Sequence, residues 1–195
     1  MSPRGWMNQG TTLFLDNLAT IGDHLLEEPT ALPGWTGRHL VAHVHYNALA
    51  LCRLASWAAT GAENPMYASP EQRNDEIEQG GRLPAAQLRE FVRGSAAQLA
   101  DTLDALPPEA WRAQVITAQG RTVPATEITW MRTREVFVHA VDLGAGATFS
   151  DMPDDVLAAL LVDVVRKRAG AGECAPLVAW LTGRATSAPP LGRWL

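Results

Sequence analysis

Residues 130–143, WMRTREVFVHAVDL, carry the feature around which the chain must fold. Glu135 and His139 are four residues apart in this stretch, so on a helix their side chains lie one above the other on one face. A carboxylate and an imidazole then lie in the middle of an apolar stripe. Burying both costs several kcal/mol unless something compensates, because unpaired charge is strongly disfavoured in a low-dielectric interior. We expect a divalent metal ion to compensate. The apolar residues of the stripe are Ile128, Met131, Val138 and Leu143.

Length and composition bound the fold and the partners. A chain of 195 residues with 47% apolar and 19% charged residues is typical of one soluble domain with a full core and room for a small appendage. Its net charge of -5 and the lack of a basic run argue against a nucleic-acid partner. No apolar stretch approaches the roughly 20 residues that cross a bilayer, so no membrane partner is expected. The N-terminus lacks the features of a secretory signal, and two cysteines fit a reducing compartment, so we expect a cytoplasmic protein.

Amphipathic patterns and breaker residues predict four long helices. Between the second and third helices, residues 63–83 read as a long polar connection, and residues 114–123 read as a short hairpin or an extended loop. The expected helices are Gln9–Glu27, a second from the N-cap Thr36 to Thr60 with Gly61 past its end, a third from Pro84 to Leu106, and a fourth opened by Pro124.

These elements predict a mainly α protein. We expect residues 1–150 to form a four-helix bundle and residues 151–195 to form a small, reduced C-terminal appendage with two short helices, over residues 154–167 and around 177–181. Metal sites in four-helix bundles are built from side chains on facing helices. The bundle therefore needs a further ligand from a helix other than the fourth.

His43 is the candidate for that ligand, because it lies in the middle of the apolar face of the second helix, whereas His45 points the opposite way. With Glu135 and His139 it makes the ligand set of an open catalytic zinc site, which leaves a fourth position for water or substrate. Two imidazoles favour zinc over magnesium or calcium, although the ligand types alone leave iron and nickel open.

Glu135 and His139 also fit arrangements that hold no metal ion. Such a pair occurs as an exposed ion pair on a helix or as a hydrogen-bonded pair in a core. His39, one turn before His43, is a rival ligand, but its position in the first turn of a helix suits capping. His24 and His45 read as surface residues.

Four runs, in this order, resemble the mycothiol-dependent maleylpyruvate isomerases, which belong to the DinB-like metal-dependent thiol enzymes. The resemblance covers roughly residues 10–153 and returns at LTGR, which ends in Arg184, and at the terminal RWL. The runs are LPGWTGRHLVAHVHYNALAL, WAATGAENPMYASPEQRNDEI, TAQGRTVPATE and WMRTREVFVHAVDLG.

The resemblance implies a DinB-like bundle with zinc held by His43, Glu135 and His139, and it implies that Arg184 assists catalysis. It also implies mycothiol as the thiol cofactor and the isomerisation of maleylpyruvate to fumarylpyruvate in aromatic-acid breakdown through gentisate. Because that substrate is a dicarboxylate, a cation should bind it; weaker candidates than Arg184 for contacting the substrate are Arg82, Arg132, Arg73, Tyr67 and Asn74. The expected partners are thus a small dicarboxylate and a low-molecular-weight thiol, acting on a monomer.

The chain departs from this family at its C-terminal end, where family members carry a larger α/β domain and only residues 154–195 remain here. Two other functions are kept open. One is a mycothiol S-transferase that uses the same metal with a different acceptor. The other is a non-catalytic bundle with a structural zinc ion, which would show four protein ligands in place of three.

Overall fold

The computed structural model describes residues 2–191, and the chain divides into two compact units between Asp151 and Met152. Within the described residues, the first unit holds five α-helices and one short hairpin, and the second holds two α-helices. Among the described residues, no helix is long and apolar enough to span a bilayer.

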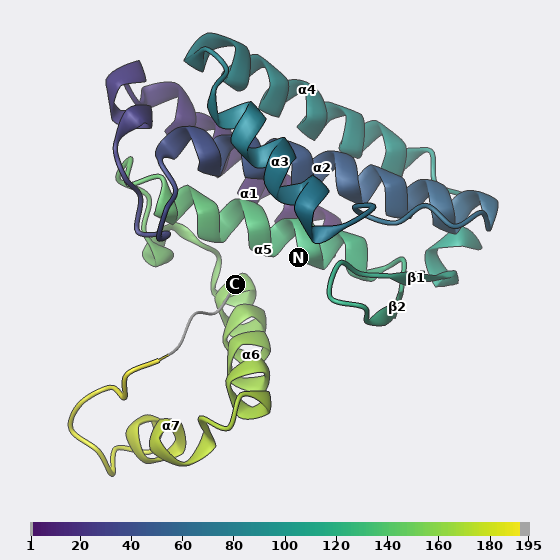
Figure 1. The fold of residues 1–195 in the computed structure, drawn as a ribbon. Coiled ribbons are helices and arrows are strands. Elements are labelled where there is room, and N and C mark those ends of the chain that lie inside the picture. Colours follow the sequence, from purple (N-terminus) through teal and green to yellow (C-terminus); the bar gives the residue numbers. More distant parts are fainter. Residues whose placement is uncertain (1, 192–195) are drawn as a thin grey trace. The chain divides into compact units, whose positions relative to one another are not determined.

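Four long helices form the body of the first unit: α1 (Pro3–Thr20), α2 (Gly37–Thr60), α4 (Ala85–Asp104) and α5 (Glu127–Asp142). Each packs against two others, because α1 contacts α5 and α4, and α2 contacts α4 and α5. Figure 1 shows them side by side along one direction. The predicted mainly α four-helix bundle is confirmed.

The ends of α2 agree with the sequence, whereas the first helix differs from its prediction. Gly61 ends α2 in the left-handed region at φ 73°, which glycine adopts without steric cost. α1 begins six residues earlier than Gln9, because Ser2 Oγ accepts a hydrogen bond from the Gly5 N–H at 3.1 Å. It also ends at Thr20, and residues Asp23–Glu27 form a separate 3₁₀ turn, η1.

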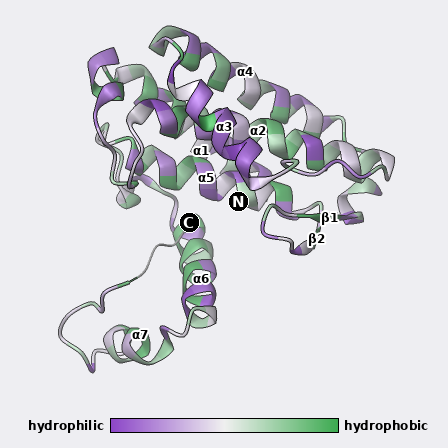
Figure 2. Ribbon diagram, viewed as in Figure 1, coloured by the Kyte–Doolittle hydropathy of each residue, from purple (hydrophilic) through white to green (hydrophobic). Residues whose placement is uncertain are grey.

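The connection over residues 63–83 contains a helix that the sequence analysis missed, α3 (Pro70–Gly81). Only Ile77 and Gly80 of this helix are buried, and Figure 2 shows it as predominantly hydrophilic. A polar helix lacks the apolar periodicity on which the prediction relied. Gly80 lets α3 approach α2 closely, because a Cβ there would lie 2.6 Å from Ala42 Cβ.

A short antiparallel hairpin precedes α5 and confirms one of the two readings of residues 114–123. Strand β1 (Gln114–Ile116) pairs with β2 (Thr122–Pro124), and Val115 and Val123 face each other as buried residues. A 3₁₀ turn, η2 (Ala110–Arg112), comes before β1. Pro124 belongs to β2, so α5 begins at Glu127 and not at the proline as predicted.

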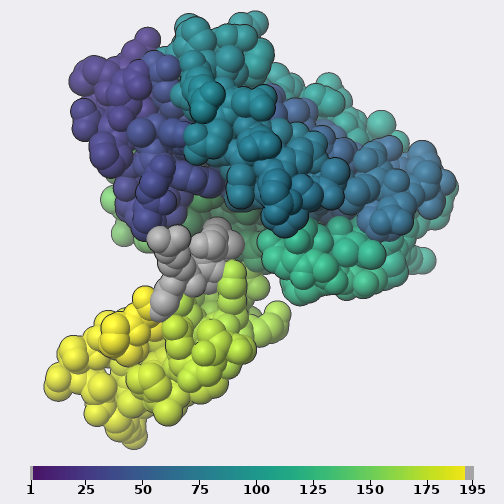
Figure 3. Space-filling model, in the orientation of Figure 1, coloured from purple at the N-terminus to yellow at the C-terminus, as the bar shows by residue number. Residues whose placement is uncertain are grey.

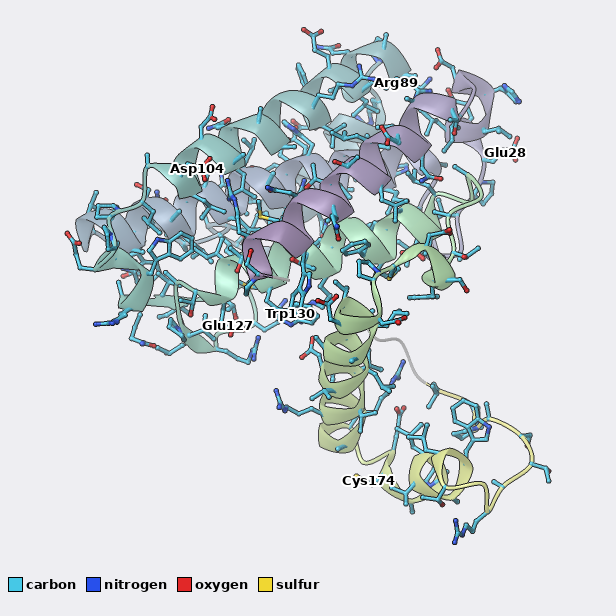
Figure 4. The ribbon with its side chains drawn as sticks, turned by 180° about the vertical axis from the view of Figure 1, so that it is seen from behind. Glu28, Arg89, Asp104, Glu127, Trp130 and Cys174 are labelled. Carbon is cyan, nitrogen blue, oxygen red and sulfur yellow. The ribbon has the colours of Figure 1, made fainter. Side chains whose placement is uncertain are left out.

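Ionic and hydrogen-bonding contacts join the two ends of α4 to α1. Arg89 Nη2 donates to the Ile21 carbonyl at 2.6 Å and lies 3.1 Å from an oxygen of Asp23. At the other end, Arg4 Nη2 lies 2.8 Å from Asp104 Oδ1. Figure 4 labels Arg89 and Asp104 at their separate positions on α4. These contacts fix α1 antiparallel to α4.

The second unit consists of α6 (Asp154–Gly170) and α7 (Cys174–Leu181), preceded in the first unit by the 3₁₀ turn η3 (Phe149–Asp151). Residues 152–191 contain no strand. Buried apolar residues of this unit are Met152, Val156, Leu160 and Leu177. The RWL run at residues 193–195 lies outside the described residues.

Candidate metal centre

His43, Glu135 and His139 meet inside the bundle, although the chain separates the first from the other two by about ninety residues. One potential ligand atom from each lies within 4.8 Å of the other two. Glu135 Oε2 is 3.0 Å from His43 Nε2 and 3.2 Å from His139 Nε2. All three residues are buried, with exposures of 6%, 9% and 3% in sequence order.

Helix periodicity explains this convergence. α2 and α5 pack against each other, and His43 lies on the buried side of α2 with Leu40 and Asn47. Glu135 and His139 are one turn apart on α5, so both face the same neighbour. The two imidazole rings lie edge to face, with centroids 5.1 Å apart.

The remaining histidines are placed elsewhere. His39 Nδ1 accepts a hydrogen bond from the Thr36 backbone N–H at 3.2 Å, which is the capping arrangement expected for the first turn of α2. His45 is half-buried and bonds the Phe91 carbonyl at 3.0 Å. His24 is exposed on η1. Within residues 2–191, the three-residue group therefore has no fourth His, Cys, Asp or Glu ligand close enough to share an ion.

Asp142 is a residue of this site that the sequence analysis did not identify as such. Its Oδ2 lies 2.8 Å from His139 Nδ1, three residues earlier on the same helix. A carboxylate on one ring nitrogen fixes the tautomer and orientation of the imidazole, so that the other nitrogen faces the site. The spacing of three residues on a predicted helix was the available signal.

Burial and mutual contacts set the charges of these groups. Burial lowers the pKa of His43, and the hydrogen bond to Glu135 offsets this only in part. Burial raises the pKa of Glu135, but His139 and His43 outweigh it and hold that pKa well below its usual value. Burial lowers the pKa of His139, but the carboxylates of Asp142 and Glu135 outweigh it and raise that pKa to about 9. At neutral pH the metal-free protein thus holds an anionic carboxylate beside one neutral and one protonated imidazole.

The residues present fit a divalent metal ion. His139 Nε2 is buried and makes no hydrogen bond of good geometry, although it lies 3.2 Å from Glu135 Oε2. A buried polar atom without a partner calls for an explanation such as a bound ion. Two imidazoles and one carboxylate are the donor set of open zinc sites, in which the fourth position takes water or substrate. Three converging ligands match a catalytic site better than a structural one.

Trp35 and Arg73 border the three-residue group on the side of α3. The Trp35 ring lies 5.2 Å from the His43 ring at an angle of 49°. Arg73 Nη2 lies 3.4 Å from His43 Nδ1. A pocket of about 230 Å³ opens beside them, and its lining consists of Trp35, Asn74, Ile77 and Glu78. Trp35 lies in an irregular loop, so no periodicity could have indicated its place.

Two of the weaker substrate-binding candidates lie away from this border. Arg132 is 1% exposed, and its Nη1 donates to the Val44 carbonyl at 2.8 Å and to Asn47 Oδ1 at 2.9 Å. Its Nη1 is thus held by residues of α2. Arg82 is exposed at the C-terminal end of α3, nine residues after Arg73, which places it about 13 Å along the helix and on its opposite side.

The other two candidates are Tyr67 and Arg184. Tyr67 is half-buried just before α3, and the Arg53 guanidinium lies over its ring, 5.9 Å from the centroid. Burial raises the pKa of Tyr67 to about 12, and the charges of Arg73 and Glu135 also act on it. Arg184 belongs to the second unit, where it is exposed and its guanidinium donates to the Thr182 carbonyl. Its role stays a prediction.

Comparison with known proteins decides the family. The model of the mycothiol maleylpyruvate isomerase N-terminal domain matches residues 8–144. The chain belongs to the mycothiol maleylpyruvate isomerase family. That match includes His43, Glu135, His139 and Asp142, whereas Arg184 lies beyond it.

Solved structures agree with this membership of the mycothiol maleylpyruvate isomerase family. A crystal structure of the mycothiol-dependent maleylpyruvate isomerase is 45% identical, with a TM-score of 0.85 over 87% of this chain and 71% of the other. A histidine-to-alanine mutant of the mycothiol-dependent maleylpyruvate isomerase is also 45% identical, with a TM-score of 0.82 over 84% of this chain and 68% of the other. No curated protein matches the chain.

Proposed function

We propose that the protein is an enzyme that isomerises maleylpyruvate to fumarylpyruvate, with mycothiol as the thiol cofactor and a divalent metal ion, zinc, held by His43, Glu135 and His139. The observation that carries the proposal is the convergence of these three side chains in a chain that belongs to the isomerase family. The likeness to a solved mycothiol-dependent maleylpyruvate isomerase at 45% identity supports the choice of substrate and thiol.

The reaction needs a nucleophile that adds to the substrate reversibly. A thiolate adds to the conjugated alkene, which becomes a single bond while its electron pair moves to the carbonyl as an enolate. The bond rotates, the enolate collapses to the trans alkene, and the thiolate leaves, so atoms, protons and electrons balance. Thiols are mostly protonated at neutral pH, and zinc when bound would supply the positive charge that lowers the pKa of an incoming thiol.

The protein itself does not supply a suitable thiol at the site. Burial raises the pKa of Cys52, so that cysteine stays protonated. It also lies nine residues after His43 on α2, which is about 13 Å along the helix and on the opposite side. Cys174 is exposed in the second unit. An external thiol therefore fits the site better than either cysteine.

The chain's own residues hold the proposed ligands in place. Asp142 accepts the Nδ1 proton of His139, so Nε2 is the nitrogen that faces Glu135 and would bind a metal ion after losing its proton. The Trp35 ring packs beside the His43 ring, with 5.2 Å between their centroids. Arg184 is proposed to assist catalysis, as the family resemblance implies.

A single assay series tests this function. Purified protein is incubated with maleylpyruvate, and the ultraviolet spectrum is followed with and without mycothiol and with and without a chelator. We expect fumarylpyruvate to form only with both thiol and metal. A rate that does not depend on the thiol would refute the proposal, and covalent transfer of mycothiol to an electrophile without isomerisation would favour the transferase.

Two variants separate the proposed ligand from a neighbour on the same helix. His43→Ala should lose both the metal and the activity, because it removes one of three ligands. His45→Ala should retain both, because His45 bonds the Phe91 carbonyl away from the site. Equal metal content in the two variants, measured by elemental analysis, would contradict the assignment.

A further inference from the structure

Arg73 differs from the other arginines that border the bundle core in having no strong partner. In the part of the chain that the structure describes, it forms no ion pair with a carboxylate. Its two side-chain contacts, to Asn74 Oδ1 and His43 Nδ1, are both 3.4 Å long, at the outer limit of hydrogen bonding. By contrast, other arginines of this unit bind carboxylates or carbonyls: Arg4 with Asp104, Arg38 with Glu27, Arg89 with Asp23 and Arg53 with the Met66 carbonyl.

The two weak contacts place the guanidinium between the metal centre and the pocket. One contact is to His43, a proposed ligand, and the other is to Asn74, which lines the pocket of about 230 Å³. Arg73 and Asn74 share a side of α3 with Ile77, which also lines the pocket. Figure 3 shows the segment of α3 at the surface of the first unit, where a small molecule can reach it. The carboxylate of Glu78 also lines the pocket, so an anion is expected at the end where Asn74 contacts Arg73 and away from Glu78.

Binding of a metal ion would free Arg73 further. A guanidinium only donates hydrogen bonds, so its contact with His43 needs an unprotonated Nδ1. A neutral imidazole that binds a metal ion through Nε2 carries its proton on Nδ1. The two donors then face each other, and the contact ends.

The charge of the site calls for such a cation. With both imidazoles neutral and Glu135 anionic, the charges of a divalent ion, the carboxylate and a bound thiolate cancel. A dicarboxylate would then enter a neutral centre within a protein of net charge -5. The planar fork of an arginine matches a carboxylate and forms hydrogen bonds stronger than neutral ones.

We propose that Arg73 binds a carboxylate group of the substrate at the entrance to the His43–Glu135–His139 site. The proposal rests on the proposed function, because it takes the substrate to be a dicarboxylate. Arg82 lies on the opposite side of α3, and Arg132 is fully buried with its Nη1 already donating. Of the candidates on the bundle, Arg73 alone has a guanidinium that touches both the pocket lining and a proposed ligand.

The test compares Arg73→Ala, Arg73→Lys and, as a matched control, Arg93→Ala, which removes an exposed arginine from α4. The probe is maleate, a stable dicarboxylate, titrated calorimetrically into the metal-loaded protein without thiol. Loss of a charged hydrogen-bonding partner corresponds to roughly a tenfold to hundredfold weaker binding in Arg73→Ala. Arg73→Lys should recover part of the loss, and Arg93→Ala should bind as the wild type does. Metal content should be equal in all four proteins.

Steady-state kinetics give a second readout. Arg73→Ala should raise the KM for maleylpyruvate and leave the KM for mycothiol unchanged, because the thiol binds through sulfur. Equal maleate affinity in Arg73→Ala and the wild type, or no maleate binding by either, would overturn the proposal. If maleate binding depends on Arg73 but the protein has no isomerase activity, the anion site at Arg73 is supported and the proposed function is refuted.

Discussion

Replacing Asp142 should weaken metal binding without unfolding the bundle. Its carboxylate lies 2.8 Å from His139 Nδ1, and its side chain is 18% exposed. Asp142 does not contact the proposed metal position itself, so its effect must pass through the orientation and basicity of the His139 ring. Removal of such a partner weakens metal binding by about tenfold to hundredfold, which corresponds to about 1.4 to 2.8 kcal/mol.

Two substitutions separate orientation from charge. Asp142→Asn keeps an oxygen that can accept from His139 Nδ1 but loses the negative charge, so we expect a loss of about tenfold. Asp142→Ala loses both the acceptor and the charge, so we expect a loss of about a hundredfold. Asp101→Ala is the control, because Asp101 is exposed on α4.

Competition with a chromophoric chelator measures the metal affinity of each variant, and thermal unfolding of the metal-free proteins measures their stability. The three variants should unfold as cooperatively as the wild type. Zinc affinities of the alanine and asparagine variants equal to that of the wild type would refute the reasoning. So would a loss of equal size in Asp101→Ala, since it would show a general effect of removing charge.

Three further predictions concern the proton balance and the packing of the bundle. The pKa of His139 is raised to about 9 in the metal-free protein, so its contribution to stability is present below pH about 6.5 and is lost as the pH rises through about 9. Zinc binding at pH 7.5 should therefore release about one proton. Equal heats of binding in buffers of different ionisation enthalpy would contradict this release. Gly10→Ala should destabilise the protein by about 1 to 3 kcal/mol in denaturant unfolding, because its Cβ would lie 2.6 Å from Val136 Cγ2. Gly94→Ala on α4 should stabilise the protein by about 0.5 to 1 kcal/mol, because its Cβ would meet nothing within 4 Å. The opposite order of stabilities would contradict this packing. Gly80→Ala should push α3 away from α2 and weaken maleate binding with zinc content unchanged, and unaltered maleate affinity would show that the position of α3 does not matter.

The buried helices were predictable because each presents an apolar face at helical spacing. The same reasoning selected His43, Glu135 and His139, since polar residues in the middle of such faces must lie inside the bundle. The structure brings these three together, and it confirms the ends of α2 and the hairpin. The periodicity of apolar residues was thus enough to predict the elements whose structure depends on burial.

Features that depend on contacts between elements could not be predicted in the same way. α3 buries only Ile77 and Gly80, so its helix is set by the cap at Ser69 and by packing on α2. Arg132 lies on the ligand side of α5, but its partners are Asn47 and a carbonyl of α2. The positions of α3 and of the Arg132 side chain depend on how the helices cross, which the hydrophobic pattern of one helix does not specify.

Asp142 and Arg73 illustrate two kinds of missed signal. Asp142 is three residues from His139 on one helix, so spacing alone could have paired them. Arg73 gave no such signal, because its place beside His43 depends on the helix that was read as a polar connection. A functional side chain on an irregular or polar segment becomes visible only when the tertiary structure is known.

We propose that His43, Glu135 and His139 hold one metal ion with a position left for the sulfur of an external thiol. The most direct measurement is the absorption spectrum of the cobalt-substituted protein during titration with mycothiol. We predict a sulfur-to-cobalt charge-transfer band that saturates at one thiol per chain and is absent in His139→Ala. A cobalt spectrum that mycothiol leaves unchanged, in protein that holds one cobalt ion per chain, would show that the metal ion offers no position to the thiol.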